Sequence, residues 1–246
     1  MTEQMKRDGL ASGTINRHLS TLSKLLRHAE RIDVIPKRPH IVYMKEPHGR
    51  ERVLSPAEER HMDMFFRHHG LMDAWALTFF LLYTGCRKGE AYGLTRASVE
   101  DGRITFGYKT TKNSKTRVVP LVGPAVTAWN LIKRSSVDGR PFQGYPKDTY
   151  RNHWDRLRQH MGLLDDKEFV PHMLRHTCAT RLVSQGIPLS KVMLWMGHTC
   201  VQTTLRYSHL APDDLEGAAD ALATYDHLPP LERYDNLIPL GPRVFR

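Results

Sequence analysis

Residues 74–90 read AWALTFFLLYTGCRKGE, and this stretch decides how the chain folds. Its first ten residues are almost entirely apolar, which is typical of a helix buried inside a sizeable domain. Thr84 and Gly85 end that run, and Arg87 stands at the start of a second short helix predicted over 87–94. Main-chain N–H groups and a guanidinium would converge there, so the turn favours an oxyanion or a phosphate. Alternatively, Arg87 pairs with Glu90 and only fixes the turn.

Helical patterns dominate on both sides of this stretch. Before it, the capping box SPAE at 55–58 begins a helix that runs to about His69. After it, residues 103–107 and 116–121 are predicted as two strands of a hairpin, joined by a polar connection over 108–115. Further helices are predicted over about 123–135, 148–162, 172–185, 190–197 and 200–209. The pattern predicts a mainly α fold with a small antiparallel β-sheet, of the α+β class.

The two ends of the chain differ from this central part. Apolar residues at 15, 19, 22, 26 and 29 predict a helix over Ser12–Arg31. Residues 33–50 hold three prolines and are predicted to be an interdomain linker. From residue 211 onward three Arg stand against seven acids, and four prolines after 225 predict a tail without regular structure. The expected domains are 1–50, 51–210 and 211–246.

Charge and composition narrow the class of partner. The 246 residues include 36 Lys and Arg against 26 Asp and Glu, a formal net charge of +10, which calls for a polyanionic partner. Residues 1–50 hold ten Lys or Arg and five acids, half of that surplus. The longest apolar stretch is about half of the ~20 residues that a membrane span needs, and the N-terminus lacks the apolar run of a secretion signal. Three cysteines are too few for a disulfide framework or a four-cysteine zinc site.

The predicted helix over 172–185 carries the densest group of candidate functional residues. His172 and Arg175 lie three positions apart, so both side chains can point at one spot. His172 and His176 have the spacing of a helical metal-ligand pair, but no Glu follows the first His and no carboxylate or Cys supports them, so no metal site is predicted. Lys112, in the polar connection, could bring an ammonium to a ligand. Each of these residues alone is more often an ordinary surface residue.

Five motifs, taken together, are far more specific. In chain order they resemble the catalytic domain of the tyrosine recombinases, the phage-integrase family of site-specific DNA recombinases, over roughly residues 50–210. Residues 14–29 are similar to the last helix of the family's core-binding domain, so a partial core-binding segment is expected before the catalytic domain. The motifs are TGCRKGE (84–90), TKNSKTRVVPL (111–121), PHMLRHTCATRL (171–182), LWMGHT (194–199) and TTLRYSHL (203–210).

The resemblance implies a set of site residues. The six expected catalytic residues are Arg87, Lys112, His172, Arg175, His198 and Tyr207. Four further basic residues are assigned to DNA contact, with a merely solvated polar face as the alternative for the first two: Arg17, Lys24, Lys115 and Arg117. No cofactor and no metal ion are expected.

The resemblance also implies a reaction. Tyr207 would attack a DNA phosphodiester to form a 3′-phosphotyrosyl bond, with His172 as the base that takes its proton and Lys112 as the acid that protonates the departing 5′ oxygen. Arg87 and Arg175 would bind the non-bridging oxygens, and His198 would add a hydrogen bond. Two alternatives are a type IB topoisomerase-like enzyme and a non-catalytic or regulatory DNA-binding integrase fragment.

The expected setting follows from the same resemblance. The partner would be double-stranded DNA at a specific recombination site, bound by a tetramer on paired sites, with a monomer as the state without DNA. The acidic tail would pack on an adjacent protomer or fold back over its own basic cleft. The protein would be cytoplasmic and nucleoid-associated, encoded by a bacterium or a phage.

Overall fold

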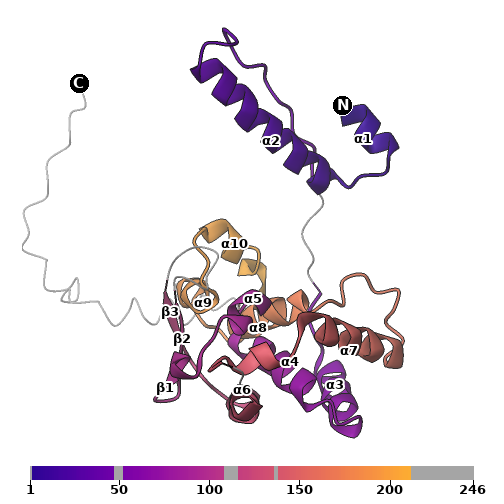
Figure 1. Ribbon diagram of the computed structural model, residues 1–246, viewed down its shortest axis with the longest axis vertical. Helices are drawn as coiled ribbons and strands as arrows, with labels where there is room; N and C mark the ends of the chain where they lie inside the picture. Colours follow the sequence, from indigo (N-terminus) through magenta and orange to yellow (C-terminus); the bar gives the residue numbers. More distant parts are fainter. Residues whose placement is uncertain (1, 47–51, 108–115, 136–137, 212–246) are drawn as a thin grey trace, which may run out of the picture. The chain divides into compact units, whose positions relative to one another are not determined.

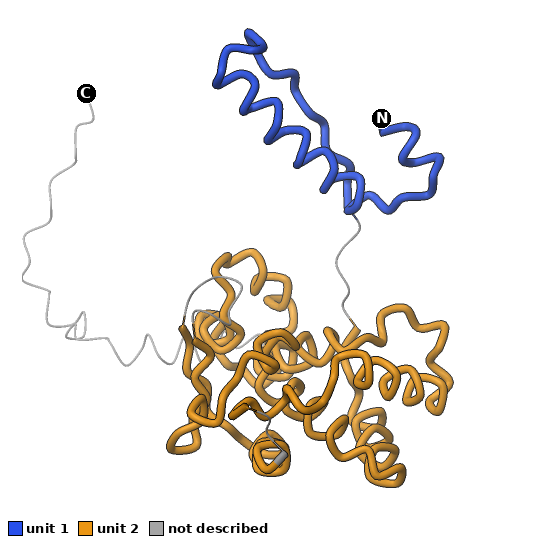
Figure 2. The backbone as a smooth tube through the Cα atoms, viewed as in Figure 1, with its two compact units in different colours: residues 1–51 blue, residues 52–246 orange. Residues whose placement is uncertain are grey.

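The computed structural model describes residues 2–46, 52–107, 116–135 and 138–211. The chain forms two compact units, Met1–Glu51 and Arg52–Arg246 (Figure 2). The expected tail, 211–246, lies outside the described residues except for its first position. The elements in chain order (Figure 1) are α1 (Thr2–Arg7), α2 (Ser12–Arg31), α3 (Pro56–His68), α4 (Met72–Thr84), α5 (Lys88–Tyr92), η1 (Arg96–Ser98), β1 (Val99–Glu100), β2 (Arg103–Phe106), β3 (Arg117–Pro120), α6 (Pro124–Ile132), η2 (Lys133–Ser135), η3 (Pro141–Gly144), α7 (Lys147–His160), α8 (His172–Ser184), α9 (Leu189–Met196), α10 (Val201–Leu205) and η4 (Ser208–Leu210).

The first unit is built on α2, which has the predicted bounds. Its apolar stripe buries Ile15 and Leu19. The proline-rich segment that follows runs back beside the helix, because the Asn16 amide donates to the Met44 carbonyl at 2.8 Å and accepts from the Met44 N–H at 2.8 Å. A short helix that the sequence pattern did not predict, α1, precedes α2.

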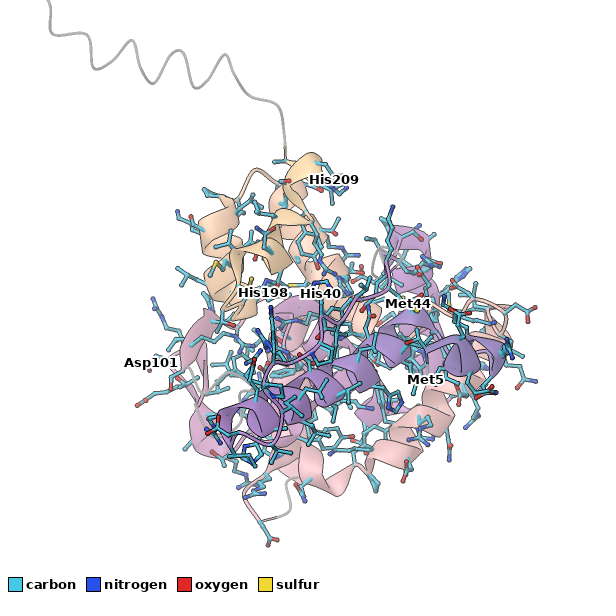
Figure 3. All side chains as sticks on the ribbon, turned by 90° about the horizontal axis from the view of Figure 1, so that it is seen from above. Met5, His40, Met44, Asp101, His198 and His209 are labelled. Atoms are coloured by element: carbon cyan, nitrogen blue, oxygen red, sulfur yellow. The ribbon has the colours of Figure 1, made fainter. Side chains whose placement is uncertain are left out.

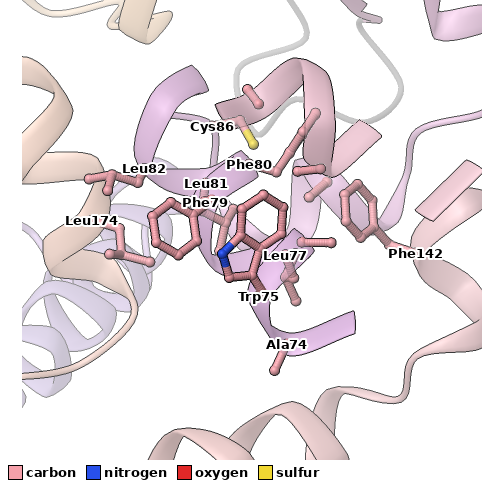
Figure 4. Packing of buried hydrophobic residues seen from close by; sticks show 14 of the residues in the cluster. Ala74, Trp75, Leu77, Phe79, Phe80, Leu81, Leu82, Cys86, Phe142 and Leu174 are labelled. Atoms are coloured by element: carbon pink, nitrogen blue, oxygen red, sulfur yellow. The ribbon is translucent and has the colours of Figure 1, made fainter. Parts of the chain in front are cut away.

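The second unit is organised around α4. This helix is buried along nearly its whole length and packs against α3, α5, α6, α7 and α8, which explains why its sequence is apolar on every face. Trp75 stacks on Phe79, and Phe80 contacts Phe142 with ring centroids 5.0 Å apart (Figure 4). The prediction of a helix inside a sizeable core is confirmed.

The sheet has one more strand than predicted. The expected hairpin is present as β2 and β3, which pair antiparallel with Ile104 opposite Val119. Val99–Glu100 adds an antiparallel edge strand, so the order is β1-β2-β3. Two residues are too few to show an alternating pattern, which is why the sequence did not reveal this strand.

The prediction of one continuous helix over 200–209 is wrong. The structure has α10 over Val201–Leu205 and the 3₁₀ turn η4 over Ser208–Leu210, with Tyr207 between them. Tyr207 is buried in a small cluster with Cys178, Val183 and Met196. The interruption turns this tyrosine inward against α8 and α9.

Within the described ranges, no helix combines the length and the apolar character that crossing a bilayer requires.

Candidate active site

The first positively charged group of the site stands at the junction of α4 and α5. Gly85 ends α4 in the left-handed conformation, with φ of 63°, and a Cβ there would lie 2.8 Å from the Met196 sulfur. Arg87 caps α5, and the Glu90 carboxylate accepts hydrogen bonds from the Arg87 N–H and from its Nη1, both at 2.9 Å. The alternative that Arg87 pairs with Glu90 is therefore what the structure has, and the guanidinium still keeps 28% of its side chain exposed.

Glu90 also binds Arg117, which the sequence analysis assigned to DNA contact. The Arg117 guanidinium donates to both Glu90 oxygens, at 2.7 and 3.2 Å, and its Nε donates to the Trp195 carbonyl at 3.1 Å. The side chain is 8% exposed and lies over the Phe106 ring. These hydrogen bonds join β3 to α5 and α9, and DNA contact by Arg117 stays a prediction.

The carboxylate of Glu90 is the acidic centre of this network. Its side chain is 1% exposed. Burial alone would raise its pKa, but the hydrogen bonds and positive charge of Arg117, with help from the Arg87 N–H, hold the pKa below its usual value. Glu90 is therefore ionised at neutral pH and fixes two arginines at once. The sequence pattern does not reveal this double role; the i,i+3 spacing to Arg87 is its only local signal.

The second arginine comes from the first turn of α8. Arg175 is 5% exposed, and its two terminal nitrogens donate to the carbonyls of Gly85 and Met196, each at 2.5 Å. Burial and the nearby Arg87 lower the pKa of Arg175 to about 10, which leaves it charged at neutral pH. Both carbonyls end helices, α4 and α9, where the helix dipole favours a cation.

A cavity of about 290 Å³ brings three of the predicted residues together. Arg87, His172 and Arg175 all line it, and the rest of the wall consists of Leu81, Cys86, Lys88 and the 170–171 turn. His172 is exposed at the start of α8. Burial raises the pKa of the Cys86 thiol to about 12, so this sulfur contributes no charge. Two arginines and one imidazole around one hollow form a site for a small anion.

His198 lies on the loop between α9 and α10, where Figure 3 labels it. A hydrogen bond of 2.8 Å joins its Nδ1 to the Thr204 hydroxyl. Burial, followed by the charges of Arg175 and Arg87, lowers the pKa of His198 to about 4, so the imidazole is neutral at neutral pH.

Tyr207 contacts His176, a histidine whose spacing in the sequence suggests only a metal ligand. Its hydroxyl lies 2.6 Å from Nδ1 of His176, and the tyrosine is 7% exposed. Burial raises the pKa of the Tyr207 phenol. The signal in the sequence was the position of His176 one helical turn after His172: the two rings lie 5.0 Å apart.

The remaining four predicted residues lie outside the described residues or in the first unit. Lys112 and Lys115 lie outside the described residues. Arg17 and Lys24 are exposed on α2, in the other unit. Across the described residues, no three His, Cys, Asp or Glu side chains are grouped so that they could hold a metal ion.

Comparisons with known proteins agree with this architecture. Residues 62–213 match the model of the phage integrase family. The chain is 35% identical over 155 residues to tyrosine recombinase XerD of Pasteurella multocida, which covers 55% of this chain and 50% of that protein. It is 33% identical over 138 residues to an integrase of Haemophilus phage HP1, covering 56% of this chain and 37% of the relative. The chain thus spans about half the length, or less, of these two relatives.

Solved structures with the same fold include two recombination proteins. The Tn1549 transposon integrase in complex with a circular intermediate DNA gives a TM-score of 0.73 at 23% identity, over 91% of this chain and 82% of that one. The XerH site-specific recombinase bound to its palindromic difH substrate gives 0.63 at 22% identity, over 88% of this chain and 69% of that one. With the family match covering more than half of the sequence, the chain belongs to the phage integrase family and contains its tyrosine recombinase catalytic domain.

Proposed function

We propose that the protein is a site-specific DNA recombinase, or integrase, which cleaves and rejoins DNA strands through a covalent 3′-phosphotyrosyl intermediate. The observation that carries the proposal is the cavity lined by Arg87, His172 and Arg175, in a chain of this family. A phosphodiester is a monoanion with two non-bridging oxygens, and two forked guanidiniums suit it well.

The chemistry needs charge stabilisation and two proton transfers. Arg87 and Arg175 stabilise the negative charge that grows on the non-bridging oxygens as phosphorus becomes five-coordinate, and His172 and His198 add hydrogen bonds. The Tyr207 oxygen forms the new bond to phosphorus, its proton passes to an imidazole, and the bond from phosphorus to the 5′ oxygen breaks. Lys112 donates a proton to that oxygen. Because cationic side chains supply the positive charge, the reaction needs no metal ion.

The substrate is double-stranded DNA carrying a specific recombination site. The relatives XerH and the Tn1549 integrase were solved with DNA bound, which supports this choice. Arg17, Lys24 and Lys115 contact phosphates, and residues 1–50 serve as a partial core-binding segment. The acting form is a tetramer on paired sites, in the cytoplasm of a bacterium.

A pool of nicked duplexes, randomised in sequence around the nick, tests the proposal. Cleavage near a nick releases a short strand, so the covalent complex cannot be rejoined and survives detergent. We expect wild type to retain a subset of sequences and Tyr207→Phe to retain none. No adduct with wild type, or an equal adduct with Tyr207→Phe, would refute the proposal; relaxation of supercoils without exchange between two selected sites would favour a topoisomerase.

A further inference from the structure

The hydroxyl that the proposed reaction must deprotonate is already held by one side chain. Tyr207 Oη and His176 Nδ1 are 2.6 Å apart and form a short hydrogen bond. Tyr207 directly precedes η4, and His176 belongs to α8. Tyr207 is buried and His176 is half-buried, so water has little access to the pair. We propose that His176 is a catalytic residue: its Nδ1 accepts the proton of the Tyr207 hydroxyl as the phenol attacks the scissile phosphate.

Two histidines then share the work that the sequence assigns to His172 alone: one contacts the phosphate, and the other takes the proton of Tyr207. His172 and His176 lie one turn apart on α8, with ring centroids 5.0 Å apart and planes at 85°. His172 lines the cavity with Arg87 and Arg175. The proposed reaction places the phosphate in this cavity, where the imidazole of His172 would contact one of its oxygens. His176 is the one that contacts the phenol. The inference rests on the proposed function and names the proton acceptor within it.

The protonation state of His176 suits an acceptor. Burial, then the charges of His172, Arg206 and Arg175, lower the pKa of His176 to about 4, so the ring is neutral at neutral pH. With its ring proton on Nε2, it leaves Nδ1 to accept from the phenol. A bound phosphodiester brings negative charge beside the same cations and offsets their part of this depression, so His176 becomes more basic when DNA is in place.

The step is balanced in atoms and charge. The Tyr207 oxygen forms a bond to phosphorus while its proton moves to Nδ1 of His176. The bond from phosphorus to the 5′ oxygen breaks, and that oxygen takes a proton from Lys112, as in the proposed reaction. In rejoining, the 5′ hydroxyl attacks phosphorus and returns a proton to Lys112, and the imidazolium of His176 returns its proton to the tyrosine.

A merely structural role is the competing explanation, since two partly buried polar groups satisfy each other. The chain offers a matched control, because Tyr145 Oη lies 2.7 Å from Nδ1 of His153. Tyr145 directly follows η3, His153 belongs to α7, and neither residue lines the cavity. Asparagine places a polar atom close to the position of Nδ1 but cannot take up a proton. His176→Asn therefore keeps a hydrogen-bonding partner for the tyrosine and removes only its basicity.

The test measures the single-turnover rate of adduct formation on a duplex selected from the randomised pool. We expect His176→Asn to slow cleavage by about 10²-fold or more, the usual contribution of a general base. His153→Asn should leave the rate within about twofold of wild type, while both variants show similar thermal midpoints. A His176→Asn rate equal to that of His153→Asn would overturn the inference and leave the proposed function intact; wild type without an adduct would overturn both.

Discussion

The buried carboxylate of Glu90 holds Arg87 and Arg117 by hydrogen bonds, and replacing Glu90 with glutamine tests how much these bonds stabilise the fold. Oε1 accepts from Nη1 of Arg87 and Nη1 of Arg117, and Oε2 accepts from the Arg87 N–H and Nη2 of Arg117. In Glu90→Gln an NH₂ group replaces one oxygen, so about half of these hydrogen bonds become donor against donor.

The expected cost follows from that count. A hydrogen bond to a charged group contributes about 1.5 kcal/mol or more, so losing two of them lowers the free energy of unfolding by about 3 kcal/mol. The same value is at the low end of the range of ~3–5 kcal/mol for removing one partner of a buried ion pair. Asp148→Asn is the matched control, because Asp148 and Arg151 form an ion pair with side chains 82% and 70% exposed. That change should cost less than ~1 kcal/mol.

Urea unfolding, followed by tryptophan fluorescence, measures the free energy of unfolding of both variants. All four tryptophans lie in the second unit, so the signal reports on the unit that holds Glu90. Arg117→Met should also destabilise, and the double variant Glu90→Gln/Arg117→Met should lose less than the sum of the two, because each change removes the same contacts. A loss of less than ~1 kcal/mol in Glu90→Gln, or strict additivity in the double variant, would show that Glu90 does not hold the two arginines in this way.

Three further predictions concern other parts of the molecule. Gly85→Ala should lower the free energy of unfolding by about 1 kcal/mol more than Gly70→Ala in urea, since both have φ of 63° but only Gly85 would place its Cβ 2.8 Å from a buried sulfur; equal losses would contradict this. Because the folded-state pKa of His198, about 4, lies below its ordinary 6.5, the unfolded state binds more protons between these values, so stability is full above about 6.5 and falls as the pH drops toward about 4. The urea midpoint of His198→Gln should therefore fall less than that of wild type between about pH 7 and about pH 5, and an equal fall would count against it. Arg17→Ala and Lys24→Ala should each reduce the slope of log binding constant against log salt by about 1 on a selected duplex; an unchanged slope would remove that residue from the DNA contact.

Local patterns in the sequence predicted the helices well because each pattern has a local cause. The stripe of α2 and the all-apolar α4 carry their own signal of burial, and α2 begins and ends where predicted. The turn before Tyr207 could not be predicted in this way. Tyr207 in this turn is hydrogen-bonded to His176, 31 positions earlier on another helix, and no local pattern shows such a contact.

The site shows the same division between local and distant causes. The motifs led to Arg87, His172 and Arg175, which the structure gathers around one cavity. They could not reveal that Arg117 is held by Glu90, because the two are 27 positions apart and meet only when β3 packs near α5. The sequence predicts DNA contact for Arg117, and the fold gives this side chain partners inside the protein.

The anchoring of Arg175 has an entropic consequence for ligand binding. An arginine side chain that becomes ordered loses up to ~2 kcal/mol of rotamer freedom. Arg175 has lost that freedom already when the chain folds, because two main-chain carbonyls hold both of its terminal nitrogens. An anion entering the cavity therefore meets a cation that needs no further ordering, whereas an exposed arginine such as Arg17 must give up its mobility at each encounter.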